Sequence, residues 1–138
     1  MRIRDKKTFW DLSMKSIYFL IAMSLISAGK AFADERHCLA KIMYAEEGQS
    51  FEGAVAVGQA TITRADNQEV SVCQVKGVKR KALPKPIAPY YLAVATELLA
   101  KPKTSVVGNA DSWNTGKKPR QPGKITRVIG NHVYYEAR

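Results

Sequence analysis

Apolar residues recur at the three- and four-residue spacing of amphipathic helices in three stretches of the chain. The pattern predicts three helices, over about residues 35–47, 50–65 and 89–100. Gly48 lies where the first helix would stop, and the hydroxyl of Ser50 is suited to capping the second. Small residues line the second helix, Gly53 and Gly58 among them, so another backbone can approach it closely. We therefore expect this helix at the packed centre.

The remainder of the chain is rich in turns. Residues 75–89 combine Lys, Pro and Gly, and their composition predicts a loop with a cationic rim. Alternating apolar and polar residues over 125–135 predict one or two short strands. The expected fold class is therefore a small, mainly α domain with a short β-hairpin or an irregular C-terminal part.

The amino-terminal third has the three-part pattern of a secretory signal peptide. Basic residues precede an apolar run over residues 17–26, and Ala31-Phe32-Ala33 provides an Ala-x-Ala exit. The run of about 10 residues is shorter than the roughly 20 that span a membrane. We expect residues 1–33 to be a cleaved signal and 34–138 to be one exported domain, periplasmic or extracellular. An uncleaved anchor and a start at Met14 are the alternatives.

The chain of 138 residues has 22 Lys and Arg against 12 Asp and Glu, a net charge of +10. Six of the basic and two of the acidic residues lie in 1–33, so the expected domain keeps sixteen and ten, a charge of +6. Such a charge favours a polyanionic partner, and export favours the cell envelope over nucleic acid. Simple solubility is the alternative reading. No nucleotide-binding, serine-elbow or zinc motif occurs, so we expect no cofactor and no metal.

Two cysteines, Cys38 and Cys73, both lie in the expected domain. Export predicts a disulfide between them, worth roughly 4 kcal/mol in the chain-entropy model. A pair of reduced thiols would require that the chain stays in the cytosol.

Candidate acid chemistry centres on Glu46 and Glu47, which lie at a predicted helix end between apolar residues and a glycine turn. Shielding from water raises the pKa of a carboxyl group and lets it act as a general acid. Taken alone, the residues favour the alternative, two solvated glutamates at a helix end.

Several ordered blocks resemble the cell wall hydrolase family named for the spore-cortex-lytic enzyme SleB. The resemblance covers most of residues 38–135 and is most specific in three blocks: Tyr44-Ala45-Glu46, Glu52-Gly53 with the Ala54-Val55-Ala56-Val57 that follows, and Ile129-Gly130-Asn131-His132. It implies a lysozyme or lytic transglycosylase-like domain that cuts peptidoglycan between N-acetylmuramic acid and N-acetylglucosamine.

The resemblance places the family's catalytic acid on Glu46. It also implies a set of substrate-contacting residues around that acid: Tyr44, Thr63, Trp113, Asn114 and His132. The residues after Glu46 depart from the family pattern, since the chain is one residue shorter there and lacks an arginine. Glu47 therefore stays a competing acid, and Thr63 replaces the usual asparagine.

The chemistry favours transglycosylation over hydrolysis, because a hydrolase needs a second carboxylate and Glu46 has no obvious partner. Asp111 is the candidate second carboxylate if the reaction is hydrolysis. Two other classes remain open: a basic module that binds peptidoglycan without cutting it, and a cationic protein that binds membranes or nucleic acid. The basic residues are scattered over loops, so we expect no nucleic-acid partner and membrane contact only through the signal. The sequence leaves the oligomeric state open.

Overall fold

The computed structural model describes residue 32 and residues 34–46, 50–100 and 105–138. The chain divides into two units, Met1–Ala33 and Asp34–Arg138. Apart from Phe32, the expected signal lies outside the described residues, so its presence and cleavage stay predictions. Within the described part, no helix has the length and apolar character needed to cross a membrane.

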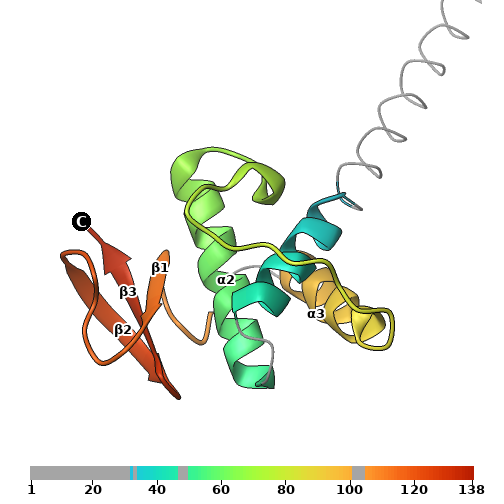
Figure 1. The fold of residues 1–138 in the computed structure, drawn as a ribbon. Helices are drawn as coiled ribbons and strands as arrows, with labels where there is room; N and C mark the ends of the chain where they lie inside the picture. Colours follow the sequence, from blue (N-terminus) through green and yellow to red (C-terminus); the bar gives the residue numbers. More distant parts are fainter. Residues whose placement is uncertain (1–31, 33, 47–49, 101–104) are drawn as a thin grey trace, which may run out of the picture. The chain divides into compact units, whose positions relative to one another are not determined.

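Helices form the first part of the second unit. Residues 34–46 form a helix, which we call the Glu46 helix. Helix α2 (Phe51–Gln68) follows, then the 3-10 helix η1 (Val72–Gln74) and helix α3 (Ala88–Ala100) (Figure 1). The Ser50 hydroxyl accepts a hydrogen bond from the Gly53 amide over 2.9 Å, which confirms the predicted cap of α2. All three predicted helices are present, and α2 runs three residues beyond its expected end.

Close packing of α2 explains its small residues. A Cβ atom at Gly58 would lie 2.5 Å from Leu98 Cδ1 and 3.1 Å from Met43 Sδ. A Cβ at the first distance would push the end of the Leu98 side chain aside, so glycine lets α3 and the Glu46 helix lie close to α2 at this point. Ala54, Val57 and other small residues of α2 are fully buried in the same core. The expected central place of this helix is therefore confirmed.

A disulfide fixes the Glu46 helix to the segment after α2. Cys38 and Cys73 are bonded, with their Cα atoms 5.1 Å apart, as the sequence predicts. Cys73 lies in η1, and the loop that follows crosses back over the Glu46 helix, where the Lys81 amide donates to the Lys41 carbonyl over 3.3 Å. The disulfide and this hydrogen bond hold η1 and the predicted Lys and Pro loop against the Glu46 helix.

The C-terminal part is a three-stranded antiparallel sheet in the order β1-β3-β2. Its strands are β1 (Ser112–Thr115), β2 (Gly123–Ile129) and β3 (His132–Ala137). Gly130 turns the chain between β2 and β3 with φ +56°, a left-handed conformation that glycine adopts without steric cost. The expectation of a mainly helical domain with a hairpin is thus correct only in coarse form, because β1 adds a strand and the domain is mixed α and β.

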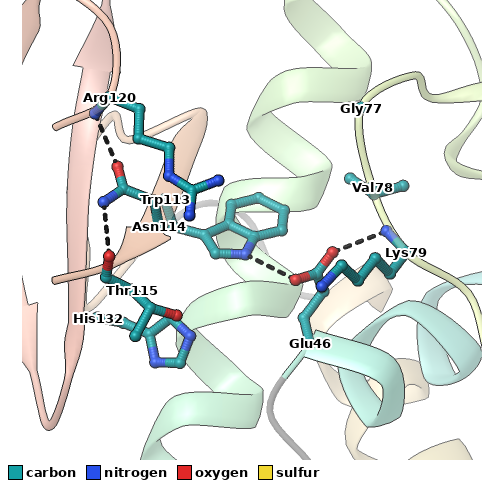
Figure 2. Close-up of a pocket in the computed structure, with 9 residues that line it drawn as sticks. All are labelled: Glu46, Gly77, Val78, Lys79, Trp113, Asn114, Thr115, Arg120 and His132. Carbon is teal, nitrogen blue, oxygen red and sulfur yellow. Dashed lines mark hydrogen bonds between the residues drawn. The ribbon is translucent and has the colours of Figure 1, made fainter.

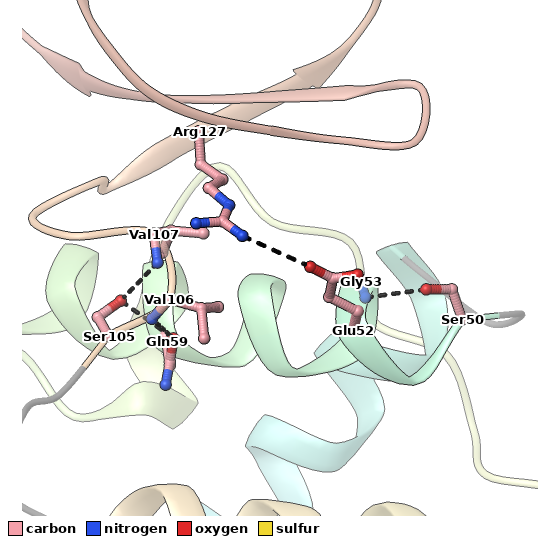
Figure 3. A network of polar contacts seen from close by, with 8 residues as sticks. All are labelled: Ser50, Glu52, Gly53, Gln59, Ser105, Val106, Val107 and Arg127. Atoms are coloured by element: carbon pink, nitrogen blue, oxygen red, sulfur yellow. Dashed lines mark hydrogen bonds and ion pairs between the residues drawn. The ribbon is translucent and has the colours of Figure 1, made fainter.

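Helix α2 lies between the sheet and the other two helices (Figure 1). Gln59, half-buried on α2, holds the chain that leads into the sheet: its Oε1 accepts hydrogen bonds from the Ser105 hydroxyl at 3.0 Å and the Val106 amide at 2.7 Å (Figure 3). At the far end of the helix, Glu52 and Arg127 of β2 form an exposed ion pair at 4.0 Å. The hydrogen bonds of Gln59 thus fix the start of the segment that leads into the sheet, while the ion pair is an exposed contact.

Candidate active site

Glu46 projects from the Glu46 helix toward the sheet, and two N–H groups hold its carboxylate (Figure 2). The backbone amide of Lys79 donates to Oε1 over 2.7 Å, and the indole Nε1 of Trp113 donates to Oε2 over 3.4 Å. The first contact is short and the second is long for a hydrogen bond. The carboxylate is therefore fixed firmly through one oxygen and only weakly through the other. Glu46 itself is half-buried.

A pocket of about 360 Å³ opens beside this carboxylate. Its walls come from three parts of the chain: the Glu46 helix, the Lys and Pro loop, and the sheet with its turn. The lining residues are Glu46, Gly77, Val78, Lys79, Trp113, Asn114, Thr115, Arg120 and His132. Among the described residues of this lining, Glu46 is the sole carboxylate. Lys79 and Arg120 place positive charge in the wall.

Arg64 of α2 supports Trp113 from the side. Its guanidinium carbon lies 4.7 Å from the centre of the indole ring, a cation–π contact. Its Nε donates to the Asp111 carbonyl over 2.6 Å, and its Nη1 to the Gly77 carbonyl over 2.8 Å. Burial lowers the pKa of Arg64 from its ordinary value, and the negative charges of Asp111 and Glu46 oppose that shift. Arg64 therefore joins α2, the Lys and Pro loop and β1 where Trp113 meets Glu46.

Strand register brings His132 to the same pocket. Thr115 of β1 pairs with His132 of β3, and Trp113 pairs with Tyr134. Because alternate residues of a strand share a face, Trp113 and Thr115 lie on one side of the sheet with these two partners. The imidazole of His132 lies 6.4 Å from the Tyr134 ring, centre to centre. His132 thus forms the pocket wall beside Thr115.

Asn114 braces the turn that follows β1. Its buried side chain accepts a hydrogen bond from the Arg120 amide over 3.0 Å and donates to the Lys118 carbonyl over 3.0 Å. It also donates to the Thr115 carbonyl over 3.1 Å, so it fixes the end of β1 and the backbone of Arg120. Figure 2 shows the Arg120 side chain reaching from there toward Trp113.

No family model, curated protein or solved structure matches this chain. The function has to be inferred from the geometry and the sequence.

Four of the six candidate residues, Glu46, Trp113, Asn114 and His132, line one pocket. The other two lie elsewhere. Tyr44 packs edge-on against Tyr91, with ring centres 5.5 Å apart, and the Thr63 hydroxyl donates to the Gln59 carbonyl over 3.1 Å. Neither side chain lines the pocket, so their contact with a substrate stays a prediction. Glu47, the competing acid, lies outside the described residues.

Both oxygens of Asp111, the candidate second carboxylate, accept hydrogen bonds from the protein. Its Oδ1 accepts from the Ala137 amide at 3.0 Å and the Ser112 hydroxyl at 3.1 Å, and its Oδ2 accepts from the Asn67 amide group at 3.0 Å. It lines a neighbouring pocket rather than the one at Glu46. This bonding fits a structural role in joining β1, β3 and α2.

Sequence reasoning missed Lys79, Thr115 and Arg120 as pocket residues. Lys79 contacts Glu46 through its backbone amide, and a pattern of side chains in the sequence does not reveal such a contact. The proximity of Thr115 and Arg120 depends on β1, a short strand that the sequence did not predict. Across the described part of the chain, no group of three His, Cys, Asp or Glu residues is arranged to hold a metal ion.

Proposed function

We propose that this protein cleaves the glycan strand of peptidoglycan between N-acetylmuramic acid and N-acetylglucosamine, with Glu46 as the proton donor. The observation that carries the proposal is the carboxylate of Glu46, held at the wall of a pocket by the Lys79 amide on Oε1 and facing Trp113 with Oε2. The resemblance of residues 38–135 to SleB-type hydrolases supports the same assignment.

The unequal hydrogen bonds give the two oxygens of Glu46 different roles. Oε1 receives a short hydrogen bond and behaves as the carbonyl oxygen of a protonated acid. Oε2 has only the long contact to Trp113, so it is the oxygen with room for a proton and for a sugar oxygen. A general acid must lie within hydrogen-bond reach of the atom it protonates, and Glu46 lines the pocket in which that atom would bind.

Among the described residues, Glu46 is the one carboxylate that lines the pocket, and this favours transglycosylation. Glu46 gives its proton to the glycosidic oxygen as the bond from that oxygen to C1 of muramic acid breaks. The C6 hydroxyl of the same sugar then bonds to C1 and returns its proton to Glu46. The product is a 1,6-anhydro sugar, and the acid is regenerated without a second carboxylate or a water molecule. Asp111, with both oxygens engaged, is poorly placed to replace this internal nucleophile.

The surrounding residues suit a sugar ligand. Trp113 offers an aromatic face and edge, while Thr115 and His132 offer polar groups on the same wall. The helices and sheet meet at this pocket, as in a lysozyme-like domain, which is the finer fold that we propose. Export to the compartment that holds peptidoglycan is consistent with the Cys38–Cys73 disulfide.

Digestion of isolated peptidoglycan sacculi tests the proposal. The purified protein is expected to release soluble fragments, and Glu46→Gln is expected to lose the activity by roughly 100- to 10,000-fold, the usual contribution of a general acid. Glu136→Gln makes the same change at an exposed residue of β3 that does not line this pocket, and it serves as the matched control. Glu47→Gln tests the competing acid.

The alternative of a non-catalytic binding module makes a different prediction for the same material. It predicts that wild type and Glu46→Gln both sediment with sacculi and that neither releases fragments. Loss of activity in Glu47→Gln but not in Glu46→Gln would assign the proton donor to Glu47 instead of Glu46.

A further inference from the structure

A second pocket, of about 480 Å³, adjoins the one at Glu46. The two pockets share four wall residues: Gly77, Trp113, Asn114 and Arg120. The shared residues place the two pockets next to each other, with Glu46 in the lining of the first only, and we call the two together the groove and each pocket a section of it. We call the second section the basic pocket.

Three cationic residues, Arg64, Lys76 and Arg120, line the basic pocket, against one carboxylate, that of Asp111. Both oxygens of Asp111 accept hydrogen bonds from the protein. The Arg64 guanidinium is likewise occupied by the Asp111 and Gly77 carbonyls. Among the described residues, none accepts a hydrogen bond from the side chain of Lys76 or Arg120. These two cations are therefore available to a ligand.

The walls of the basic pocket are fixed by amide side chains. Gln68 of α2 accepts a hydrogen bond from the Lys76 amide over 3.0 Å, which holds the loop that carries Lys76 against the helix. Asn67 donates to Asp111 and so joins α2 to β1. On the opposite side, Asn114 fixes the backbone of Arg120. A basic, partly preformed section of groove favours a ligand with carboxylates and peptide groups.

We propose that the basic pocket binds the acidic peptide that muramic acid carries, with Arg120 and Lys76 receiving its carboxylates. This inference rests on the proposed function. Cleavage at the muramic acid places that sugar at Glu46, and its peptide is attached to the same ring through the lactyl group. The peptide therefore emerges close to the bond that is cut, where Arg120 is shared by both sections of the groove. Peptide-bearing strands, rather than bare glycan, are the substrate class that this predicts.

Binding to the full-length Glu46→Gln variant tests this inference without cleavage. The probes are two soluble glycan fragments of equal length, one with its peptides intact and one from which an amidase has removed them. At low salt, the intact fragment is expected to bind roughly tenfold more tightly, the factor given by about 1.4 kcal/mol. Adding Arg120→Gln is expected to remove most of this preference. Lys117→Gln, the same loss of charge on the same turn outside both pockets, is expected to keep it.

Equal binding of the two fragments would overturn the inference, as would a preference that Arg120→Gln leaves unchanged. Cleavage by the wild-type protein separates the two proposals. Cleavage of both fragments at equal rates would leave the proposed function standing and overturn the peptide pocket. An Arg120-dependent binding preference without any cleavage by the wild type would support the pocket and overturn the enzymatic function.

Discussion

The indole N–H of Trp113 points at Oε2 of Glu46 from a strand that lies 67 residues later in the chain. The contact joins the two halves of the fold, because Glu46 belongs to the first described helix and Trp113 to the first strand of the sheet. It is also the weaker of the two hydrogen bonds to this carboxylate. Because Trp113 belongs to the sheet, the sheet lies on the Oε2 side of Glu46. This is the side on which we propose that the substrate binds.

Replacing Trp113 by Phe separates the hydrogen bond from the ring. The phenyl ring would keep an aromatic surface for Arg64, but the N–H donor to Glu46 would be lost. We expect cleavage of sacculi to slow by roughly three- to tenfold, the range for one modest hydrogen bond, and the melting temperature to change little. Trp113→Ala, which also removes the ring, is expected to reduce both quantities strongly. Equal activity of Trp113→Phe and wild type would show that the indole N–H has no part in the reaction.

Arg64→Lys tests the clamp behind Trp113. Lysine keeps the charge but cannot bridge the Asp111 and Gly77 carbonyls as the planar guanidinium does. We expect the free energy of unfolding to fall by about 1–3 kcal/mol, because two hydrogen bonds from the guanidinium are lost. Urea denaturation followed by circular dichroism measures the change.

Arg127→Lys is the matched control for this change. Arg127 and Glu52 form an ion pair at 4.0 Å with side chains 53% and 61% exposed, and such pairs contribute about 0–1 kcal/mol. A loss at Arg127 as large as that at Arg64 would contradict the clamp.

The predicted elements came from regular, local patterns. Helical spacing and the Ser50 cap predicted the helices. The close approach of neighbouring helices at Gly58 accounts for the small residues of α2. The alternation over residues 125–135 predicted one or two short strands, and the structure contains two there, β2 and β3. Strand β1 spans only four residues, Ser112–Thr115, too few for a periodic signal.

The candidate site was predictable only where side chains carry the chemistry. Glu46 and Trp113 belong to blocks that resemble a known family, and they do line one pocket. The Lys79 contribution is a backbone amide, and any residue in that loop position except proline supplies the same donor. Arg120 and Lys76 look like ordinary loop cations in the sequence. Both line the basic pocket because contacts between α2, the Lys and Pro loop and the sheet bring them to the same place.

Reduction of the Cys38–Cys73 disulfide is expected to lower the free energy of unfolding by roughly 4 kcal/mol, since it closes a loop of 35 residues. The bond also anchors the helix that carries Glu46. Thermal unfolding with and without a reductant measures the loss, and a Cys38→Ser/Cys73→Ser variant separates it from other effects of the reductant. An unchanged melting temperature in both cases would show that packing alone holds this helix.

Product analysis in water enriched in heavy oxygen tests the role of Glu46 most directly. Cleavage in which Glu46 acts first as acid and then as base predicts 1,6-anhydro muramic acid ends that contain no oxygen from the solvent, and none of these products from Glu46→Gln. Mass spectrometry of the soluble fragments identifies such ends, because they are lighter than reducing ends by one water. Reducing ends that carry solvent oxygen, or anhydro ends formed at the wild-type rate by Glu46→Gln, would contradict this mechanism.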